Sequence, residues 1–583
     1  MVRIKAETAA EILLELLSLR GIEYFFANAG TDFVAIVEAL AKGSEQGKAF
    51  PKPVVVPHET PLLGMAYGYY LATGRPQFAM VHVGVGTANG LGMLMAANRA
   101  QVPILFSAGR SPVEGEGRFS YVHWGQDLYD QAGIVREQVK WYYELRSPFQ
   151  LEAVIDRALA MALSEPKGPV YLILPPEVMA SPVGEVEVRS EFPYDLPSTS
   201  PDLKKIERLA ELLLEACFPL LITSSLGRSP EAVEALIELS ERAAVAVVTF
   251  NPEYMNFPTD HPCHLGFSPD PFLPVADLIL VVDCDVPWYP ERAKPPSSTV
   301  VVQIGTDPLY SRYPARTFPS HLTVQGDPAT VLRQLVDLLA EPLEGKEEAL
   351  RSRRERLARM HEEIFAEYLS CARAASSSLP LDPDWVSYNV KEVLGDEAIV
   401  VNEYDNGMKP FMSQLPGHYF CNPHAGYLGW GLGTALGIKL GLPDRTVVAT
   451  VGDGSYIFSV PSACHFLAAA HKLPILTIVY NNRCWKAVRD ATRNVYPQGW
   501  ASRGDCFPLS ELYPGQYEKI CEAFGGYGER VERPEEVGPA LERALRVVQQ
   551  EGRQALLNVI CKVKIGSLSR PLTPPIGSPI IGR

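Results

Sequence analysis

Long hydrophobic runs are missing from this sequence. Its 583 residues contain no stretch of about 18 consecutive apolar residues, which is the length that a membrane-spanning helix needs. The first residues, Met1 to Glu7, also lack the apolar core of a secretory signal peptide. We therefore expect a cytoplasmic protein without a membrane partner.

An excess of positive charge and paired cysteines are missing as well. The net charge is −15 and no basic tract occurs, which argues against nucleic acid as a partner. The ten cysteines are scattered, and none forms the Cys-x-x-Cys pair that would indicate a metal or redox site. This distribution fits reduced thiols in a cytoplasm.

The chain is long enough for several domains of ordinary composition. Hydrophobic residues make up 47% of it and charged residues 21%, as in typical globular proteins. Short apolar strands alternate with helical segments, which predicts mostly parallel, doubly wound sheets. We expect three such α/β domains, at residues 1–185, 195–345 and 380–565, and a Pro- and Gly-rich tail at 566–583.

One stretch carries the strongest chemical signal. A buried strand at Thr446–Val451 is followed by Gly452-Asp453-Gly454-Ser455, a helical segment and a second strand at Pro474–Val479. This order predicts a right-handed βαβ unit with parallel strands. The strand ends then bring Asp453 and Asn482 to the edge of the sheet at which ligands bind.

These residue types suit a magnesium ion that carries a diphosphate. Mg²⁺ binds few protein oxygens and completes its shell with phosphate and water. Asp453 and Asn482 offer such oxygens, and the glycines let backbone N–H groups reach an anion at a helix N-terminus. Because Gly-Asp-Gly alone is a common turn, the Asn481-Asn482 pair about thirty residues later carries the argument.

The combination resembles the thiamine-diphosphate motif of enzymes of the acetolactate synthase and benzoylformate decarboxylase type. The resemblance implies that Asp453, Asn482 and the carbonyl of Cys484 hold Mg²⁺ and that the glycine turn binds the diphosphate. The predicted cofactor-binding residues are Glu59, Asn402, Glu403, Gly426, Leu428, Gly452, Asp453, Gly454, Ser455 and Asn482.

Two further segments extend the resemblance toward the whole chain. His58-Glu59, at a strand end, is similar to the pyrimidine-binding domain of this group, which implies that Glu59 contacts N1′ of the cofactor. The segment Gly426–Gly433 resembles the glycine-rich turn of the family, which makes Leu428 the apolar wedge beneath the cofactor. A packing helix rich in glycine is the structural alternative for this second segment.

A histidine loop carries the predicted substrate chemistry. The segment from His82 to Asn89 resembles the catalytic-histidine loop of benzoylformate decarboxylase, and a structural histidine at a strand end is the alternative. The resemblance makes Glu59, His82 and Leu428 the predicted catalytic residues. The predicted substrate-contacting residues are Asn28, Thr31, His123 and Trp485.

The middle domain gives weaker signals. The resembling synthases hold FAD there and oxalyl-CoA decarboxylases hold a nucleotide, but the arginine and paired-aspartate signature of the synthases is not evident, so FAD is doubtful. His261-Pro262-Cys263-His264 has metal-ligand residue types, yet four residues in one turn rarely converge on one ion, and we interpret it as a solvated loop. The charged segment Glu344–Glu367 is expected to be a solvated linker helix.

The resemblance implies a lyase or carboligase that acts on a small 2-oxo acid. Two alternatives stay open: a 2-hydroxyacyl-CoA lyase or oxalyl-CoA decarboxylase-like enzyme, which would need a nucleotide site in the middle domain, and a thiamine diphosphate binder without turnover. The resemblance also implies a homodimer or homotetramer, in which Glu59 of one subunit meets Asp453 of another at the interface.

Overall fold

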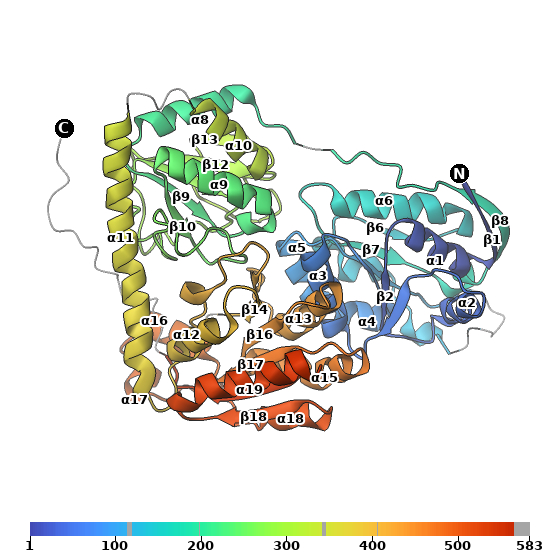
Figure 1. The fold of residues 1–583 in the computed structure, drawn as a ribbon. Coiled ribbons are helices and arrows are strands. Elements are labelled where there is room, and N and C mark those ends of the chain that lie inside the picture. Colours follow the sequence, from blue (N-terminus) through green and yellow to red (C-terminus); the bar gives the residue numbers. More distant parts are fainter. Residues whose placement is uncertain (114–118, 120, 198, 341–345, 405, 565–583) are drawn as a thin grey trace.

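We describe the fold from a computed structural model of the chain. The structure describes residues 1–113, 119, 121–197, 199–340, 346–404 and 406–564, so the predicted tail at 566–583 lies outside the described residues. Figure 1 shows three α/β bodies: the N-terminal body at the right, the middle body at the upper left and the third body below. The fold class is therefore confirmed, whereas the exact domain boundaries stay predictions.

The N-terminal body is a six-stranded parallel sheet between helices. Its elements are β1 (Val2–Thr8), α1 (Ala9–Leu19), β2 (Tyr24–Ala27), α2 (Val34–Glu45), β3 (Lys52–Val55), α3 (Glu59–Thr73), β4 (Phe78–Val81), α4 (Val83–Asn89), α5 (Leu91–Arg99), β5 (Leu105–Ala108), β6 (Tyr142–Glu144), α6 (Leu151–Leu163), β7 (Val170–Ile173), α7 (Pro176–Met179) and β8 (Pro182–Val188). The strand order is β3-β2-β4-β5-β7-β6, and β1 and β8 form a separate antiparallel pair. Strands β4, β5 and β7 are buried throughout, as expected for parallel strands covered on both faces.

The middle body is a five-stranded parallel sheet in the order β10-β9-β11-β12-β13. Its elements are α8 (Leu203–Glu215), β9 (Pro219–Thr223), α9 (Pro230–Ala243), β10 (Ala246–Thr249), β11 (Leu278–Val282), β12 (Val300–Gly305), β13 (Leu322–Gln325) and α10 (Pro328–Leu338). The strand order reverses between β9 and β11, which is where sheets of this kind usually bind a ligand.

The third body is a six-stranded parallel sheet in the order β15-β14-β16-β17-β19-β18. Its elements are α12 (Pro383–Leu394), β14 (Ile399–Glu403), β15 (Tyr419–Cys421), α13 (Trp430–Gly441), β16 (Val447–Gly452), α14 (Asp453–Phe458), α15 (Pro461–Ala470), β17 (Leu476–Asn481), α16 (Lys486–Val495), α17 (Trp500–Gly504), α18 (Tyr517–Ala523), β18 (Tyr527–Val531), α19 (Val537–Gln550) and β19 (Ala555–Ile560). Strands β16 and β17 pair in parallel, which confirms the predicted βαβ unit.

The connection within that unit differs from the single predicted helical segment. It consists of two helices, α14 and α15, and the break falls at Val460, whose φ is 54°. Pro461 follows at the start of α15. Because proline cannot donate a backbone hydrogen bond and clashes with the preceding turn, it begins a helix readily but does not continue one.

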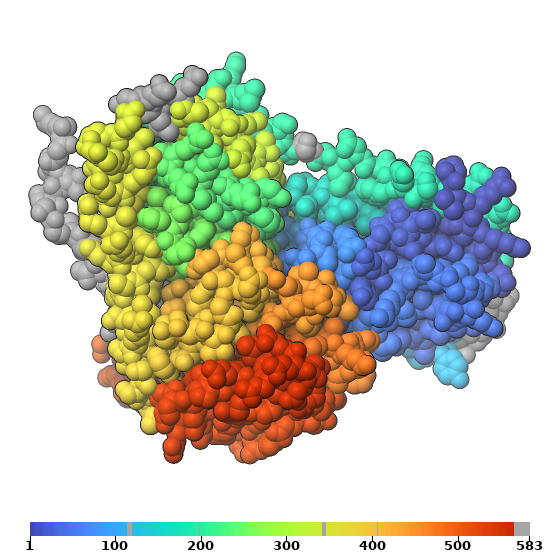
Figure 2. Space-filling model, viewed as in Figure 1, coloured from blue at the N-terminus to red at the C-terminus, as the bar shows by residue number. Residues whose placement is uncertain are grey.

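Helices α3 and α13 join the N-terminal and third bodies within one chain. A Cβ added at Gly68 would lie 2.0 Å from the carbonyl oxygen of Thr434, so only glycine permits this approach of the two backbones. At the N-terminal ends of the same helices, the hydroxyl oxygens of Thr60 and Tyr427 are 3.0 Å apart. Figure 2 shows the two bodies in contact at this junction, where blue meets orange.

The charged helix α11 (Glu347–Ala374) is more than the solvated linker that we expected. It runs beside both the middle and the third body (Figure 1). Arg353 donates to the backbone carbonyls of Ala216 and Ala243, and Arg354 to that of Glu241. These carbonyls lie at the ends of α8 and α9, where helical carbonyls lack partners and positive charge is stabilising. The arginines therefore fasten the middle body to α11.

The His261–His264 segment is also not the solvated loop that we expected. His264 is fully buried, and its Nε2 lies 3.0 Å from the hydroxyl of Thr249. Burial lowers the pKa of His264 to about 3, so its ring is neutral at pH 7. The segment is part of the core because this neutral ring packs there with one nitrogen, Nε2, hydrogen-bonded to Thr249.

Two observations concern the described residues as a whole. None of their helices combines the length and the apolar character that crossing a membrane requires. Nor do these residues contain a group of three or more His, Cys, Asp or Glu side chains that could hold a metal ion. The predicted Mg²⁺ site is of a different kind, because it has one carboxylate and takes its other ligands from an amide, a backbone carbonyl, phosphate and water.

Candidate active site

The carboxyl ends of β16 and β17 form the edge that we predict to bind a diphosphate. β16 ends at Gly452, and Asp453 begins α14 directly after it. β17 ends at Asn481 and is followed by Asn482. Because the two strands are parallel neighbours, both predicted metal ligands lie at the same edge of the sheet.

Asp453 is a buried carboxylate held by backbone groups. It is 2% exposed, and among the described residues it accepts hydrogen bonds from the backbone N–H groups of Gly454 at 3.0 Å and Arg483 at 2.7 Å. Burial raises the pKa of Asp453 to about 6. Within the described part of the chain, no positively charged side chain pairs with it. A divalent cation would compensate this buried charge, so the residues fit Mg²⁺.

The segment after β17 closes over the glycine turn. The Asn482 side-chain oxygen accepts a hydrogen bond from the backbone N–H of Cys484 at 3.0 Å. The ring of Trp485 covers Gly454, where an added Cβ would lie 2.1 Å from the ring. Gly454 is therefore required for this packing, in addition to its predicted contact with the diphosphate. Trp485 lies beside the predicted cofactor site, and its contact with a substrate stays a prediction.

Glu403 fixes the turn that carries Leu428. Its fully buried carboxylate accepts hydrogen bonds from the backbone N–H groups of Gly429 and Gly431, each at 2.7 Å. Gly429 has a φ of 88°, and a Cβ there would lie 2.4 Å from the carbonyl oxygen of Phe458, so the turn is held against α14. Burial raises the pKa of Glu403. The structure thus gives Glu403 a role in positioning the Leu428 turn.

Asn402 lies one position further back, inside the sheet. Its side-chain oxygen accepts from the hydroxyl of Thr450 at 2.8 Å, and its amide donates to the carbonyl of Tyr404 at 2.9 Å. These bonds link the ends of β14 and β16. Direct contact of Asn402 or Glu403 with the cofactor stays a prediction, as does that of Gly426.

Glu59 stands at the first position of α3, beside α4. Its carboxyl group is largely buried and accepts a hydrogen bond from the side-chain amide of Asn89 at 2.5 Å. A Cβ added at Gly86 would lie 3.2 Å from the other carboxyl oxygen, so the glycine keeps space beside it. Since the next residue, Thr60, contacts Tyr427, the structure brings Glu59 and the Leu428 turn toward each other within one chain.

His82 forms a dyad with a buried aspartate. Its Nδ1 lies 2.6 Å from Oδ1 of Asp32, which is 3% exposed. Because a carboxylate only accepts, Nδ1 carries a proton, and Nε2 is the ring nitrogen that does not bind Asp32. The hydrogen bond to Asp32 raises the pKa of His82, although burial opposes it. Glu59 lies near enough to add to this increase.

Asp32 also organises the strand ends around the histidine. Its Oδ2 accepts from the backbone N–H groups of Gly109 at 3.0 Å and Val83 at 3.3 Å. Gly30 is required for the approach, because a Cβ there would lie 2.2 Å from Nδ1 of His82. Sequence analysis missed Asp32. The only available signal was its position in a turn after a strand, next to the predicted residue Thr31.

Three other residues that we predict to contact the substrate, Asn28, Thr31 and His123, lie in the same body as this dyad. Asn28 follows β2 directly, and the hydroxyl of Thr31 lies 3.3 Å from the carbonyl oxygen of Tyr121. His123 is exposed, and its ring accepts from the backbone N–H of Gly125. From the same loop, the side chain of Gln126 lies near enough to His82 to add to the increase of its pKa. The substrate roles of all four predicted residues stay predictions.

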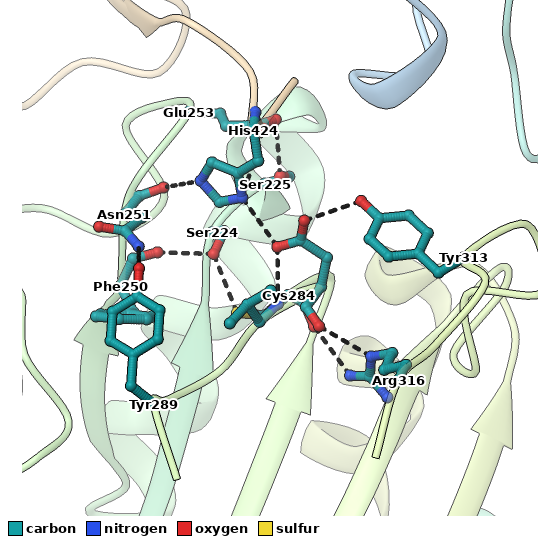
Figure 3. Close-up of polar contacts among 12 residues, drawn as sticks. Ser224, Ser225, Phe250, Asn251, Glu253, Cys284, Tyr289, Tyr313, Arg316 and His424 are labelled. Atoms are coloured by element: carbon teal, nitrogen blue, oxygen red, sulfur yellow. Dashed lines mark hydrogen bonds and ion pairs between the residues drawn. The ribbon is translucent and has the colours of Figure 1, made fainter. Parts of the chain in front are cut away.

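Side chains fill the ligand-binding edge of the middle sheet. Figure 3 shows His424 of the third body reaching this edge, where its ring bonds to the carbonyl of Asn251 in a cluster that also contains Cys284, Tyr313 and Arg316 of the middle body. A cavity at this edge, beside Arg228 and Asp283, measures about 30 Å³. This volume holds about one or two water molecules, whereas pockets for cofactors measure roughly 300–1,000 Å³.

We accordingly predict that the protein purifies without tightly bound FAD. The filled edge and the missing arginine and paired-aspartate signature both motivate this prediction. An absorption spectrum of freshly purified protein should show no flavin bands near 450 nm beyond about a few per cent occupancy. A stoichiometric flavin spectrum would contradict the prediction and favour the synthase type.

Segments along most of the chain match one known protein family. Three segments match the family described as thiamine pyrophosphate enzyme: its N-terminal TPP binding domain at residues 7–134, its central domain at 206–335 and its C-terminal TPP binding domain at 405–559. Together these segments make up well over half of the 583 residues. Their order is that of the three bodies in the structure.

Individual relatives agree with the family. A benzoylformate decarboxylase of Pseudomonas aeruginosa is 28% identical over 82% of this chain and 86% of its own length. An acetolactate synthase large subunit of Mycobacterium tuberculosis is 26% identical over 95% of each chain. The solved structure of a thiamine diphosphate-dependent 4-hydroxybenzoylformate decarboxylase of Rhodococcus jostii has the same fold, with a TM-score of 0.77, 24% identity and coverage of 96% of this chain and 100% of its own. The chain therefore belongs to the thiamine pyrophosphate enzymes, among decarboxylases and synthases.

Proposed function

We propose that this enzyme is a lyase or carboligase that decarboxylates a 2-oxo acid and then releases an aldehyde or transfers the acyl group to a second carbonyl compound. The observation that carries the proposal is the His82–Asp32 dyad beside Glu59, because it offers a proton donor for an oxo-acid substrate next to the predicted cofactor contact. The names of the relatives, which include a decarboxylase and a synthase, support the same reaction class.

Some residues of this chain would bind the cofactor, and others would transfer protons. Thiamine diphosphate, when bound, supplies a thiazolium ring that accepts the electron pair released by decarboxylation. Asp453, Asn482 and the Cys484 carbonyl would hold Mg²⁺, with Gly454 and Ser455 on the diphosphate. Leu428 would support the cofactor from below, in a turn that Glu403 fixes. Correct orientation of this kind can contribute several kcal/mol to lowering a barrier.

The two ionisable groups of the N-terminal body act on protons. Glu59 would hydrogen-bond N1′ of the pyrimidine ring and share its proton. His82, oriented by its bond to Asp32, would donate from Nε2 to the carbonyl oxygen of the substrate when its ring is protonated. General acid–base contributions of this type are typically about 10²–10⁴ in rate.

The two alternative functions, a CoA-dependent lyase or decarboxylase and a binder without turnover, have less support from the structure. A 2-hydroxyacyl-CoA lyase or an oxalyl-CoA decarboxylase-like enzyme needs a nucleotide site, and the corresponding edge of the middle sheet is filled by side chains. A binder without turnover would not need the His82–Asp32 dyad, in which the aspartate is buried and the histidine is partly exposed. Incubation of the holoenzyme with a panel of 2-oxo acids, with and without aldehydes, tests the proposal when products are identified by mass spectrometry. Absence of any decarboxylation or ligation product would reject it.

We predict that Asp32→Asn lowers kcat by about 10- to 100-fold, because it removes the charge that raises the pKa of His82 and orients its ring. The pKa of His82 should fall. If protonated His82 is the acid, the decline of kcat at high pH should therefore move to lower pH. A pH–rate profile measures this shift, and Asp127→Asn in the exposed loop nearby is the control. An unchanged profile would remove the dyad from the mechanism.

We also predict that the active site is shared between two subunits, with Glu59 from one and Asp453 from the other. Mixing the variants Glu59→Gln and Asp453→Ala under subunit exchange then yields mixed dimers with one intact site each. Random exchange of equal amounts makes about half of the dimers mixed, so about a quarter of wild-type activity should return. The Thr60–Tyr427 contact within one chain makes this test necessary, because it brings Glu59 near the Leu428 turn of its own subunit. Mixed dimers seen by native mass spectrometry without recovered activity would place the site within one chain.

A further inference from the structure

A charged cluster ties the loop before α13 to the middle body (Figure 3). His424 belongs to the loop at residues 422–429, which connects β15 to α13 and contains Leu428. Its Nδ1 lies 2.9 Å from Oδ1 of Asp285, and its Nε2 lies 3.0 Å from the backbone carbonyl oxygen of Asn251. Both partners follow strands of the middle sheet, so one histidine ring spans two bodies.

The geometry defines the protonation state of this ring. A carboxylate and a backbone carbonyl can only accept, so both ring nitrogens must donate and His424 is an imidazolium. Glu253 adds a second negative charge, with its carboxylate 4.0 Å from Nδ1 and bound to the backbone N–H of His424 at 3.1 Å. Burial lowers the pKa of His424, but the bond to Asp285 and the charge of Glu253 outweigh it and raise the pKa to about 9.

The surroundings keep the acidic partner ionised. Asp285 also accepts hydrogen bonds from the hydroxyl of Tyr313 at 2.9 Å and from the N–H of Val286 at 2.8 Å. Burial raises the pKa of Asp285, but the bond to His424 and these other bonds lower it to about 2. The other ionisable groups around the cluster are Arg99, Arg228, Asp283, Tyr310 and Arg316. Of these, Arg228 pairs with Asp283, and Arg316 binds the carbonyl of Asp285.

The loop is therefore held from both sides. On one side, His424 and the backbone of Cys421, which donates to the carbonyl of Glu253 at 2.8 Å, fasten it to the middle body. On the other side, Glu403 holds the N–H groups of Gly429 and Gly431. Leu428 lies between these anchors.

We propose that His424 is a positioning residue, whose imidazolium clamps the loop at 422–429 to the middle body and so holds Leu428 where the cofactor site requires it. The inference rests on the proposed role of Leu428 for its effect on catalysis, although the clamp itself does not. The sign of the pH effect follows from the raised pKa: the clamp is complete at neutral pH and is lost as the pH rises through about 9.

Amide hydrogen exchange of the cofactor-free full-length protein tests the clamp directly. In His424→Gln we expect the protection factors of the 422–429 peptide to fall by about 10- to 100-fold at pH 7, because hydrogen bonds to charged groups are lost. His418→Gln is the matched control, since His418 precedes β15 in the same body and contacts Pro416 and Arg445 instead of the middle body. Protection that is equal in His424→Gln and wild type would overturn the proposal.

A second variant keeps the test valid if His424→Gln folds poorly. Asp285→Asn retains an acceptor for Nδ1 but removes the charge that raises the pKa of His424. The pH at which the 422–429 peptide loses protection should therefore move below the wild-type value of about 9. Loss of protection at the same pH in both proteins would overturn the proposal.

Measurements on the holoenzyme test the effect of the clamp on catalysis and on cofactor binding. In His424→Gln we expect kcat to fall about tenfold or more and the Kd for thiamine diphosphate to rise, with partial rescue in His424→Arg, which retains a charged donor. A mobile loop with unchanged kcat and Kd would overturn the positioning role. If wild-type protein bound no thiamine diphosphate, the proposed function would fail, and the exchange measurements would still decide whether the clamp exists.

Discussion

Replacing Glu59 by glutamine should slow exchange of the thiazolium C2 proton of bound cofactor by about 10²- to 10⁴-fold, while the fold and cofactor binding persist. The variant keeps the size of the side chain and an oxygen that can accept from Asn89. It removes the acidic proton that Glu59 would share with N1′. Exchange can be followed by NMR after quenching in acid, so the measurement does not depend on knowing the substrate.

Glu177→Gln is the matched control for this experiment. Glu177 has the same exposure as Glu59, 8%, and lies in the same body, where its carboxylate accepts from the backbone N–H of Val113. We expect C2 exchange at the wild-type rate in this control. Exchange at the wild-type rate in Glu59→Gln as well would remove Glu59 from the proposed role and leave the activation of the cofactor to another group.

The parts of the fold that sequence analysis predicted are those governed by local pattern. The strands at 446–451 and 474–479 are short, apolar and followed by polar turns, so their parallel pairing follows from chain order and handedness. The buried Asp453 at a strand end was predictable for the same reason. The helical segment predicted between these strands corresponds to α15, whereas the separate helix α14, which ends before Val460 and Pro461, was not predicted.

Contacts between distant segments could not be predicted in this way. Asp32 and His82 lie on different loops, and only the parallel register of β2 and β4 brings them together. His424 and Asp285 belong to different bodies, and neither has a sequence neighbour that indicates its partner. The arginines of α11 were interpreted as solvated because their partners are backbone carbonyls, which leave no pattern in the sequence. Sequence analysis therefore found candidate reacting groups but missed residues that hold them.

The largest effect on cofactor binding should come from Asp453, whose replacement by alanine or asparagine we expect to weaken thiamine diphosphate binding by about 100-fold or more. Even residues that only support metal ligands typically change metal affinity by about 10- to 100-fold, so a direct ligand should lie at or above that range. Excess Mg²⁺ should rescue binding poorly, because the missing group is a ligand and not a distant charge.

The burial of the Asp453 charge allows loss of cofactor binding to be distinguished from loss of folding. Burial raises the pKa of its carboxyl group to about 6, and among the described residues only backbone N–H groups compensate the charge, so the cofactor-free wild-type protein carries a desolvated carboxylate at pH 7. Asp453→Asn removes that charge and keeps an acceptor, so the cofactor-free variant should unfold at the same temperature as wild type or higher. Asp396→Asn, in the turn that precedes β14 at the opposite edge of the same sheet, is the control for charge removal in this body. Calorimetry should then show cofactor binding lost in Asp453→Asn and retained in Asp396→Asn.

Unchanged binding in Asp453→Asn would move the metal site away from β16, whereas a lower unfolding temperature of the cofactor-free variant would indicate that the carboxylate is a structural residue.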